Sequence, residues 1–290
     1  MALEIQTYDL KANQDHTFTF NNPVTQYMVG MSAFSLGYGP STDHHVVKAA
    51  IQLQHNMTKN QVMVSPTLTL FDDGHQGNAE SDRVTVVVLA WTGVSAEALT
   101  LANQYGIPNQ GSGPPIPITA NSPNTNYGLL SGFDFVYSSS HHVREMSANV
   151  GTVSPVSGAL NTTLTGAAQM SDGSGHTAST AHVDGGLIVS ADNTLDIALV
   201  PTGTLYNNGA PLSLGQYASY KHFQPLLTGF RVQFPSNDDH HLQEVTAGIM
   251  VKIVGSNLAV AVGVAHLHDD SSNYEDDSQS YARGFILCYN

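Results

Sequence analysis

Short apolar runs recur along the whole chain, and polar or glycine-containing turns separate them. Most runs alternate apolar with polar residues, whereas Val84–Trp91 is continuous and β-branched, as expected for a strand buried between two layers. Short strands divided by turn signals about every 8–12 residues are typical of antiparallel β-sandwiches. The pattern therefore predicts an all-β fold, whose first strands cover residues 18–20, 25–36, 46–53, 61–71 and 84–91.

One part of this pattern occurs three times. Each copy has an early glycine, an aromatic-rich strand, a His-His pair, an acidic turn and a closing apolar strand. Such internal self-similarity indicates a repeat architecture. The landmarks are Gly30, His44-His45, Asp72-Asp73 and Trp91, then Gly132, His141-His142, Asp172-Gly173 and Ser190, then Gly229, His240-His241, Asp269-Asp270 and Tyr289.

We therefore expect three tandem, related antiparallel β-sandwich repeats over residues 1–94, 127–190 and 220–290. They either surround a pseudo-threefold axis or lie in a row. Residues 95–126 are expected to be a connector with a short helix at Ser95–Gly106, capped by Ser95 and Gly106, and a Pro/Gly-rich stretch after it. Residues 191–219 form a second expected connector. Both connectors either cross the surface or pair with the sandwiches.

The charge balance narrows the classes of partner. Charged residues are only 11% of the chain, against about 25% in an average soluble protein. The net charge of −14, from 9 basic and 23 acidic residues, argues against nucleic acid and against an anionic membrane surface. No apolar stretch reaches the length of about 20 residues that a membrane helix needs, so we expect no membrane insertion. The N-terminus has no classical signal peptide, which predicts a cytoplasmic protein or release by a non-classical route.

The first repeat resembles the H-type lectin domain. The likeness lies in the order of the segments 18–24, 27–36, 46–53, 61–73 and 83–91. The resemblance implies a small six-stranded sandwich that forms trimers and binds N-acetylgalactosamine-type sugars, and it suggests that three such domains on one chain form an intramolecular pseudo-trimer. Arg83 and Trp91 lie roughly where ligand-side residues are expected. Two departures are that only the first copy keeps the terminal tryptophan and that an insert precedes each His-His pair.

The His-His pairs and the acidic turns are the candidate binding groups. Adjacent strand residues point to opposite faces, so at most one histidine of each pair shares an environment with its equivalents. Around a threefold axis, three imidazoles drawn from His44, His45, His141, His142, His240 and His241 would converge on Zn²⁺. The alternative is that each pair simply begins a strand, with one ring hydrogen-bonded to a neighbouring turn.

The acidic turns offer carboxylates at Asp72, Asp73, Asp172, Asp269 and Asp270. Carboxylate oxygens are suitable ligands for Ca²⁺ and acceptors for sugar hydroxyls. Aspartate is also a common turn residue for purely structural reasons.

No nucleophile elbow, phosphate-binding loop or zinc-protease motif is found, so we expect a protein that is not an enzyme. The sequence favours a multivalent carbohydrate-binding, lectin-like protein, because linked weak sites gain avidity. The alternative is a structural subunit of a larger assembly, such as a phage, appendage or injection-device component. Either function predicts a homo-oligomer or a larger assembly.

Overall fold

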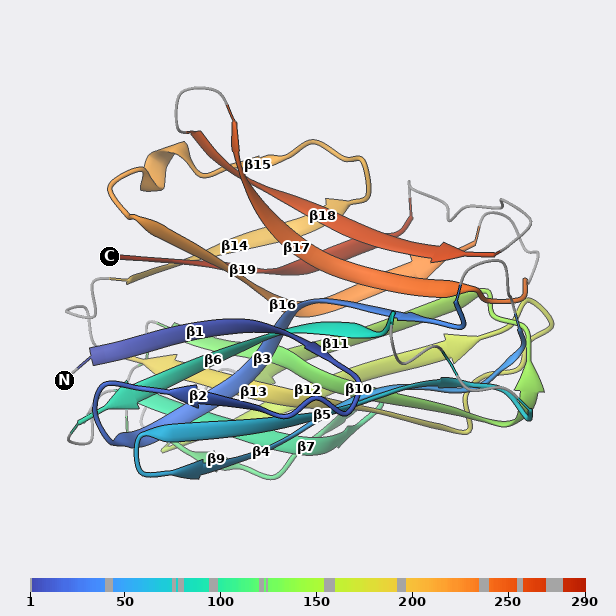
Figure 1. The fold of residues 1–290 in the computed structure, drawn as a ribbon, viewed down its shortest axis with the longest axis horizontal. Helices are drawn as coiled ribbons and strands as arrows, with labels where there is room; N and C mark the ends of the chain where they lie inside the picture. Colours follow the sequence, from blue (N-terminus) through green and yellow to red (C-terminus); the bar gives the residue numbers. More distant parts are fainter. Residues whose placement is uncertain are drawn as a thin grey trace.

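The computed structural model describes residues 2–39, 44–74, 77, 81–93, 99–119, 123, 125–153, 160–191, 197–234, 240–254, 258–269 and 279–290. Most of these residues lie in strands, and the one helical element among them is the 3₁₀ turn η1 (Gly215–Tyr217). The predicted all-β, antiparallel fold is therefore confirmed (Figure 1). The strands are β1 (Ala2–Lys11), β2 (His16–Thr19), β3 (Val24–Gly37), β4 (Val46–Thr58), β5 (Gln61–Phe71), β6 (Arg83–Thr92), β7 (Leu99–Pro108), β8 (Gly111–Ser112), β9 (Ile116–Pro117), β10 (Thr125–His141), β11 (Glu145–Val153), β12 (Asn161–Ser171), β13 (Thr180–Ser190), β14 (Ile197–Tyr206), β15 (Leu212–Ser213), β16 (His222–Gln233), β17 (Glu244–Val254), β18 (Leu258–His268) and β19 (Tyr281–Tyr289).

The strands form three antiparallel sheets with one common plan. The first sheet has the order β1-β6-β3-β17-β18-β15, the second β2-β5-β4-β10-β13-β7, and the third β14-β19-β16-β11-β12-β8. In each sheet, strands from one predicted repeat continue into strands from another. Strands β7, β8, β14 and β15, which lie in the two expected connectors, complete the sheets at their outer edges. Residues 1–94, 127–190 and 220–290, the three predicted repeats, therefore share sheets pairwise, and their strands are arranged in a ring. Below, the word repeat denotes these three segments.

The pairing between repeats fixes their register and corrects one landmark. In each repeat, the residue four positions after the first histidine pairs with a residue on the neighbouring repeat. These equivalent pairs are Lys48↔Val136, Glu145↔Gln233 and Glu244↔Gly37. Val136, Gln233 and Gly37 are thus equivalent to one another, and so are the residues four positions before them, which are Gly132, Gly229 and Ala33. The predicted equivalence of Gly30 with the two later glycines is therefore wrong, because Ala33 occupies that place in β3.

A register shift occurs at this place in all three repeats, at Met31/Ala33, Leu130/Gly132 and Leu227/Gly229. Such bulges bend a strand and change the direction of its side chains. The backbones also approach closely here, since a Cβ atom on Gly132 would lie 2.5 Å from the carbonyl oxygen of Ile51. A small residue is therefore required where the strand crosses from its own sandwich to the neighbouring repeat.

The helix predicted over Ser95–Gly106 is wrong within the part that the structure describes, because residues 99–108 form strand β7. Residues 95–98 lie outside the described residues. Leu99, Leu101 and Ile107 are buried, and β7 pairs with β13 along its length. Likewise, β14 lies within the second expected connector and pairs with β19. For residues 99–108, pairing with the exposed edge of β13 stabilises a strand more than the capping residues Ser95 and Gly106 stabilise a helix.

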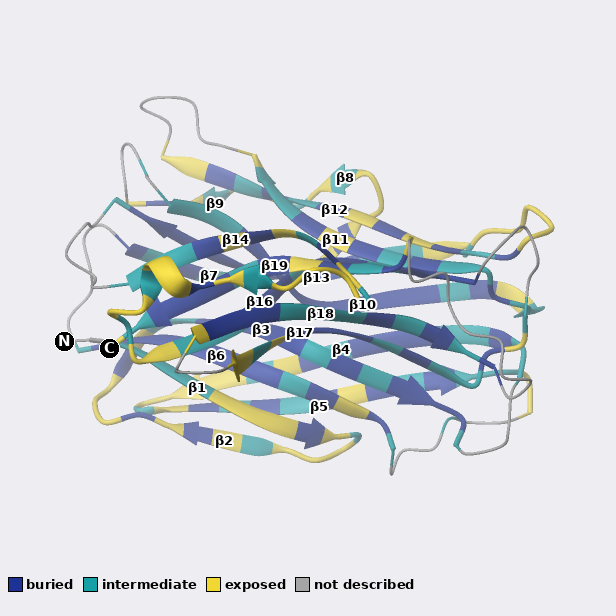
Figure 2. Cartoon of the chain, turned by 90° about the horizontal axis from the view of Figure 1, so that it is seen from above, coloured by how far each residue is buried: buried dark blue, intermediate teal, exposed yellow. Residues whose placement is uncertain are grey.

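Side chains from all three repeats meet on the axis of the ring. Phe34, Phe133 and Phe230, which we call the Phe cluster, occupy equivalent positions, and their ring centroids lie 5.0–5.4 Å apart. Towards the end that holds both chain termini, a second apolar cluster includes Leu89, Ile188 and Leu287. Buried residues run through the centre of the molecule, and exposed residues gather along the outer strands such as β1 and β2 (Figure 2).

Three polar contacts join equivalent positions on the paired strands. Lys48 Nζ lies 2.9 Å from Asp134 Oδ2, and Arg231 Nη2 lies 2.9 Å from Glu145 Oε2. The first contact joins repeats one and two, and the second joins repeats two and three. At the boundary between the first and third repeats, the Ser35 hydroxyl donates to Glu244 Oε1 at 3.0 Å. The charge pattern differs at each boundary, so these contacts favour one pairing of the repeats over the others.

Asp82 is a buried carboxylate near the end of β3. It is 2% exposed, and its Oδ1 accepts the Gly37 N–H at 2.9 Å. Burial raises the pKa of Asp82 from 3.8 to about 6; Glu244 adds to this rise, and the Gly37 hydrogen bond opposes it. Because the folded state holds this proton more tightly than the unfolded state, the contribution of Asp82 to stability is greatest below about pH 4 and falls as the pH rises from about 4 to about 6.

Asp82→Asn is therefore expected to raise the free energy of unfolding at pH 7 by about 2–3 kcal/mol, since one pKa unit corresponds to about 1.4 kcal/mol. Asparagine keeps the acceptor for Gly37 and removes the charge. Urea denaturation at pH 4 and pH 7 measures the effect, and the gain should vanish at pH 4. Asp73→Asn, at an exposed turn, is the control. Equal stability of Asp82→Asn and the parent at pH 7 would contradict the prediction.

Candidate functional site

The first histidine of each pair binds the first carboxylate of the acidic turn in its own repeat. The distance from Nδ1 to Oδ2 is 3.1 Å for His44–Asp72, 3.3 Å for His141–Asp172 and 3.2 Å for His240–Asp269. An aromatic ring packs on each of these histidines, from Tyr38, Tyr137 and Phe234 respectively. A contact between one histidine ring of each pair and a neighbouring turn is thus present in three matching copies.

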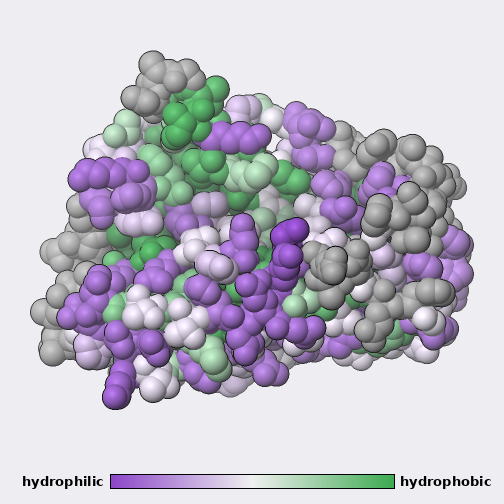
Figure 3. Space-filling model, viewed as in Figure 1, coloured by the Kyte–Doolittle hydropathy of each residue, from purple (hydrophilic) through white to green (hydrophobic). Residues whose placement is uncertain are grey.

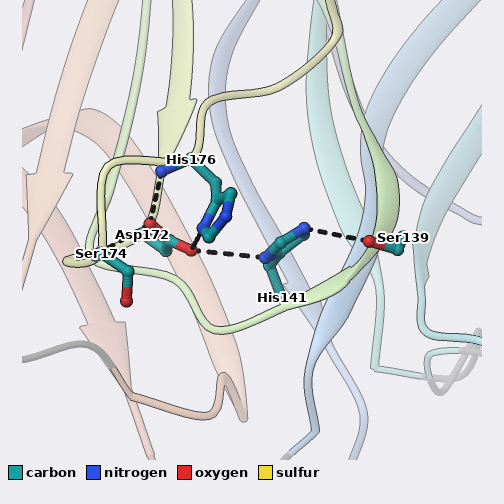
Figure 4. Close-up of polar contacts among 5 residues, drawn as sticks. All are labelled: Ser139, His141, Asp172, Ser174 and His176. Atoms are coloured by element: carbon teal, nitrogen blue, oxygen red, sulfur yellow. Dashed lines mark hydrogen bonds and ion pairs between the residues drawn. The ribbon is translucent and has the colours of Figure 1, made fainter.

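The contact is most elaborate in the second repeat (Figure 4). Asp172 Oδ2 lies 2.6 Å from His176 Nδ1, and Asp172 Oδ1 accepts the backbone N–H groups of Ser174 and His176. On the far side of His141, its Nε2 contacts the Ser139 hydroxyl at 3.1 Å. Burial would raise the pKa of Asp172, but the hydrogen bonds from His176 and Ser174 outweigh it and lower the pKa. This carboxylate therefore stays ionised and orders the turn.

The second histidine of each pair points to the axis. His45, His142 and His241, which we call the histidine ring, have ring centroids 4.4–4.8 Å apart. Their nitrogen ligand atoms all lie within 4.8 Å of one another. Burial and the neighbouring rings of His142 and His241 lower the pKa of His45, against a smaller opposite effect of Asp72. His45 is therefore neutral at pH 7 and able to act as a ligand.

The residues predicted as sugar or calcium ligands do not come together. Asp72, Asp172 and Asp269 bind histidines, Asp73 is an exposed turn residue, and Asp270 lies outside the described residues. Arg83 begins β6 and is exposed. Trp91, at the opposite end of β6, is 8% exposed and belongs to the second apolar cluster, which leaves little of its ring for a ligand.

A pocket lies instead between the first and second repeats. It has a volume of about 510 Å³ and is lined by Gln52, Leu53, Gln54, His55, Tyr105, Gly106, His182 and Asp184. These residues come from β4, β7 and β13, which belong to one sheet. We call this the Tyr105 pocket.

A bulge in β7 places Tyr105. The register with β13 shifts between Val183 and Gly185. Gly106 has a φ of +64°, a conformation that glycine adopts without strain. The Gly106 N–H donates to Asp184 Oδ1 at 2.7 Å. The bulge leaves Tyr105 with 52% of its surface exposed, and its hydroxyl donates to the carbonyl oxygen of Leu53.

Aromatic side chains line up beside the pocket. The His55 ring stacks on Tyr105 with centroids 5.3 Å apart, and His55 Nδ1 lies 2.9 Å from the Tyr27 hydroxyl. A second pocket of about 450 Å³ shares Tyr27, His55 and Tyr105. Burial lowers the pKa of His55 to about 4, and burial with Tyr27 and Asp184 raises the pKa of Tyr105 to about 12. Both rings are therefore uncharged at neutral pH.

Sequence reasoning missed most of this pocket. Tyr105 lies in the segment that the sequence predicts to be a connector, and His55, His182 and Asp184 belong to no motif. Tyr105-Gly106 within an alternating apolar pattern is the one available signal, because a glycine inside a strand often marks a bulge.

Comparisons of the chain with protein-family models, with curated proteins and with solved structures found no match. Within the described residues, no helix is both long and apolar enough to span a membrane. The fold and site thus define an all-β protein of three shared sheets with an aromatic pocket between two repeats.

Proposed function

We propose that this protein is a non-catalytic carbohydrate-binding protein whose principal site is the Tyr105 pocket. The observation that carries the proposal is the half-exposed Tyr105 ring, fixed by a bulge and flanked by a carboxylate, amides and imidazoles. Pyranose sugars present an apolar face of C–H groups and a rim of hydroxyls. A flat aromatic ring packs against the apolar C–H face, and the surrounding polar groups form hydrogen bonds with the hydroxyls.

The polar groups suit a neutral sugar. Gln52 and Gln54 each offer an acceptor oxygen and two N–H donors, and Asp184 supplies acceptor oxygens. Asp184 is 5% exposed and is held by Gly106, so it is preorganised for binding. The Tyr105 hydroxyl is already bonded to Leu53, which restricts the ring before a ligand arrives.

The three boundaries between repeats carry different residues, so we propose one principal site on each chain. The positions of His182 and Asp184 in β13 correspond to Arg83 and Thr85 in β6, and to Tyr281 and Arg283 in β19. A ligand that requires the carboxylate finds it only at the first boundary. Avidity then comes from oligomers, in which several such sites act together.

Tyr105→Ala is expected to weaken sugar binding at least tenfold, because the stacking surface is lost. A glycan array identifies the sugar, starting from galactose and N-acetylgalactosamine, and isothermal titration calorimetry then measures the affinity. Asp184→Asn should also weaken binding while retaining an acceptor for Gly106.

Tyr206→Ala is the matched control, because Tyr206 is 44% exposed on β14 of another sheet. It should bind as the parent does. Equal losses in Tyr206→Ala and Tyr105→Ala, or sugar binding unaffected by Tyr105→Ala, would move the site away from this pocket.

The exposed β17–β18 hairpin favours a second candidate, a structural subunit of a larger assembly. Ile253, Val254 and Leu258 are 63%, 48% and 42% exposed, and apolar atoms gather on this face beside the hairpin tip (Figure 3). Exposed apolar clusters are common at protein contacts. Rings or filaments in electron micrographs, without sugar binding on the array, would favour this candidate over the first.

A further inference from the structure

The histidine ring brings together three chain segments that are about a hundred residues apart. His45, His142 and His241 each follow the histidine that is bound to a carboxylate. Because adjacent strand residues point to opposite faces, fixing the first ring on its aspartate directs the second towards the axis. Three equivalent His–Asp contacts thus place the histidine ring.

Backbone pairing also fixes the position of each pair. The backbone of His44 exchanges two hydrogen bonds with that of Leu242, and the backbone of His240 exchanges two with Val143. His141 faces Val46 in the same way. Each histidine pair is therefore joined to the neighbouring repeat by backbone pairing next to the imidazole that points to the axis.

From this geometry we infer that His45, His142 and His241 bind one transition-metal ion, of the class of Zn²⁺, Co²⁺ or Ni²⁺, on the axis of the ring. Tetrahedral zinc with Zn–N bonds of about 2.0–2.1 Å needs nitrogen atoms about 3.3 Å apart. The present limit of 4.8 Å requires each ring to move inward by less than about 1 Å, which a side-chain rotation provides.

The composition of the site selects the class of metal. Three imidazole nitrogens suit zinc and its neighbours, whereas Ca²⁺ and Mg²⁺ require oxygen ligands. The carboxylates of Asp72, Asp172 and Asp269 contact the first histidine of each pair, next to the histidine ring in sequence, and their negative charge favours a bound cation nearby. The Phe cluster further along the axis offers no ligand atom, so the fourth position is expected to hold water on the outer side.

The chain expressed without a polyhistidine tag tests the inference. After treatment with EDTA and titration with Zn²⁺, calorimetry should show one tight site per chain. Co²⁺ should give the intense visible absorption of a four-coordinate ion. His142→Ala and, separately, His241→Ala should each lower the affinity for Zn²⁺ at least 100-fold. Zn²⁺ should raise the melting temperature of the parent but not of these two variants.

Two controls separate this site from other histidines. His222→Ala, at an exposed position on β16, should bind Zn²⁺ as the parent does. His176→Ala removes one member of the His141, Asp172 and His176 group, whose ligand atoms also lie close together. Loss of the tight site in His176→Ala with retention in His142→Ala would overturn the inference, as would the absence of tight binding in a folded parent. Circular dichroism establishes that each variant is folded.

Discussion

Phe133→Ala is expected to lower the free energy of unfolding by about 3–5 kcal/mol, one of the two largest effects that the structure predicts. Phe133 is 1% exposed and contacts Phe34 and Phe230 on the axis. Its removal leaves a cavity that all three repeats line, and rigid strands restrict how far the surroundings can collapse into it.

Urea denaturation followed by tryptophan fluorescence measures this loss, with Phe133→Leu and Phe223→Ala as controls. Leucine retains most of the apolar volume, so Phe133→Leu should cost less than half as much as alanine. Phe223 is only half-buried on β16 and is not a member of the Phe cluster. Because the repeats share their sheets, Phe133→Ala should still unfold in one transition. Two separate transitions would mean that the repeats are independent units.

Lys48→Glu is the substitution with the second large expected effect: it should lower the free energy of unfolding by about 3 kcal/mol. The side chain of Asp134 is 9% exposed and that of Lys48 is 26% exposed, so the substitution places two carboxylates together with little water. Gln52 also donates to Asp134 Oδ2, at 3.3 Å, and it cannot compensate for a second negative charge.

The double variant Lys48→Glu/Asp134→Lys reverses the pair and should recover at least half of the lost stability in the same denaturation experiment. Arg231→Glu opposite Glu145 is the parallel test at another boundary. Its effect should be smaller, because those side chains are 34% and 17% exposed. If the double variant is no more stable than Lys48→Glu alone, charge pairing does not specify this boundary.

The all-β fold class could be predicted from the sequence because strand patterning is local. The alternating run Gln61–Phe71 became β5, and the continuous run Val84–Trp91 became the core of β6. The three His-His pairs likewise marked equivalent positions shortly before β4, β11 and β17, and the second histidine of each pair points to a common axis. In these cases a residue and its neighbours in sequence decide the outcome.

Features that depend on distant strands could not be predicted. Ala33 replaces Gly30 as the equivalent of Gly132 because pairing with β17 sets the register. The segment after Ser95 has a helical capping pattern, yet residues 99–108 add to the edge at β13. Tyr105 becomes a pocket residue only through the bulge that this pairing produces.

The shared first sheet also constrains how the chain matures during synthesis. Gly37 in β3 pairs with Glu244 in β17, more than 200 residues later, so the first sheet stays incomplete until the last third of the chain has left the ribosome. Until then β3 presents an unpaired edge of backbone N–H and C=O groups, the kind of edge on which strands of other chains add. A nascent or truncated chain of this protein is therefore expected to depend on chaperones in a way that the finished ring does not.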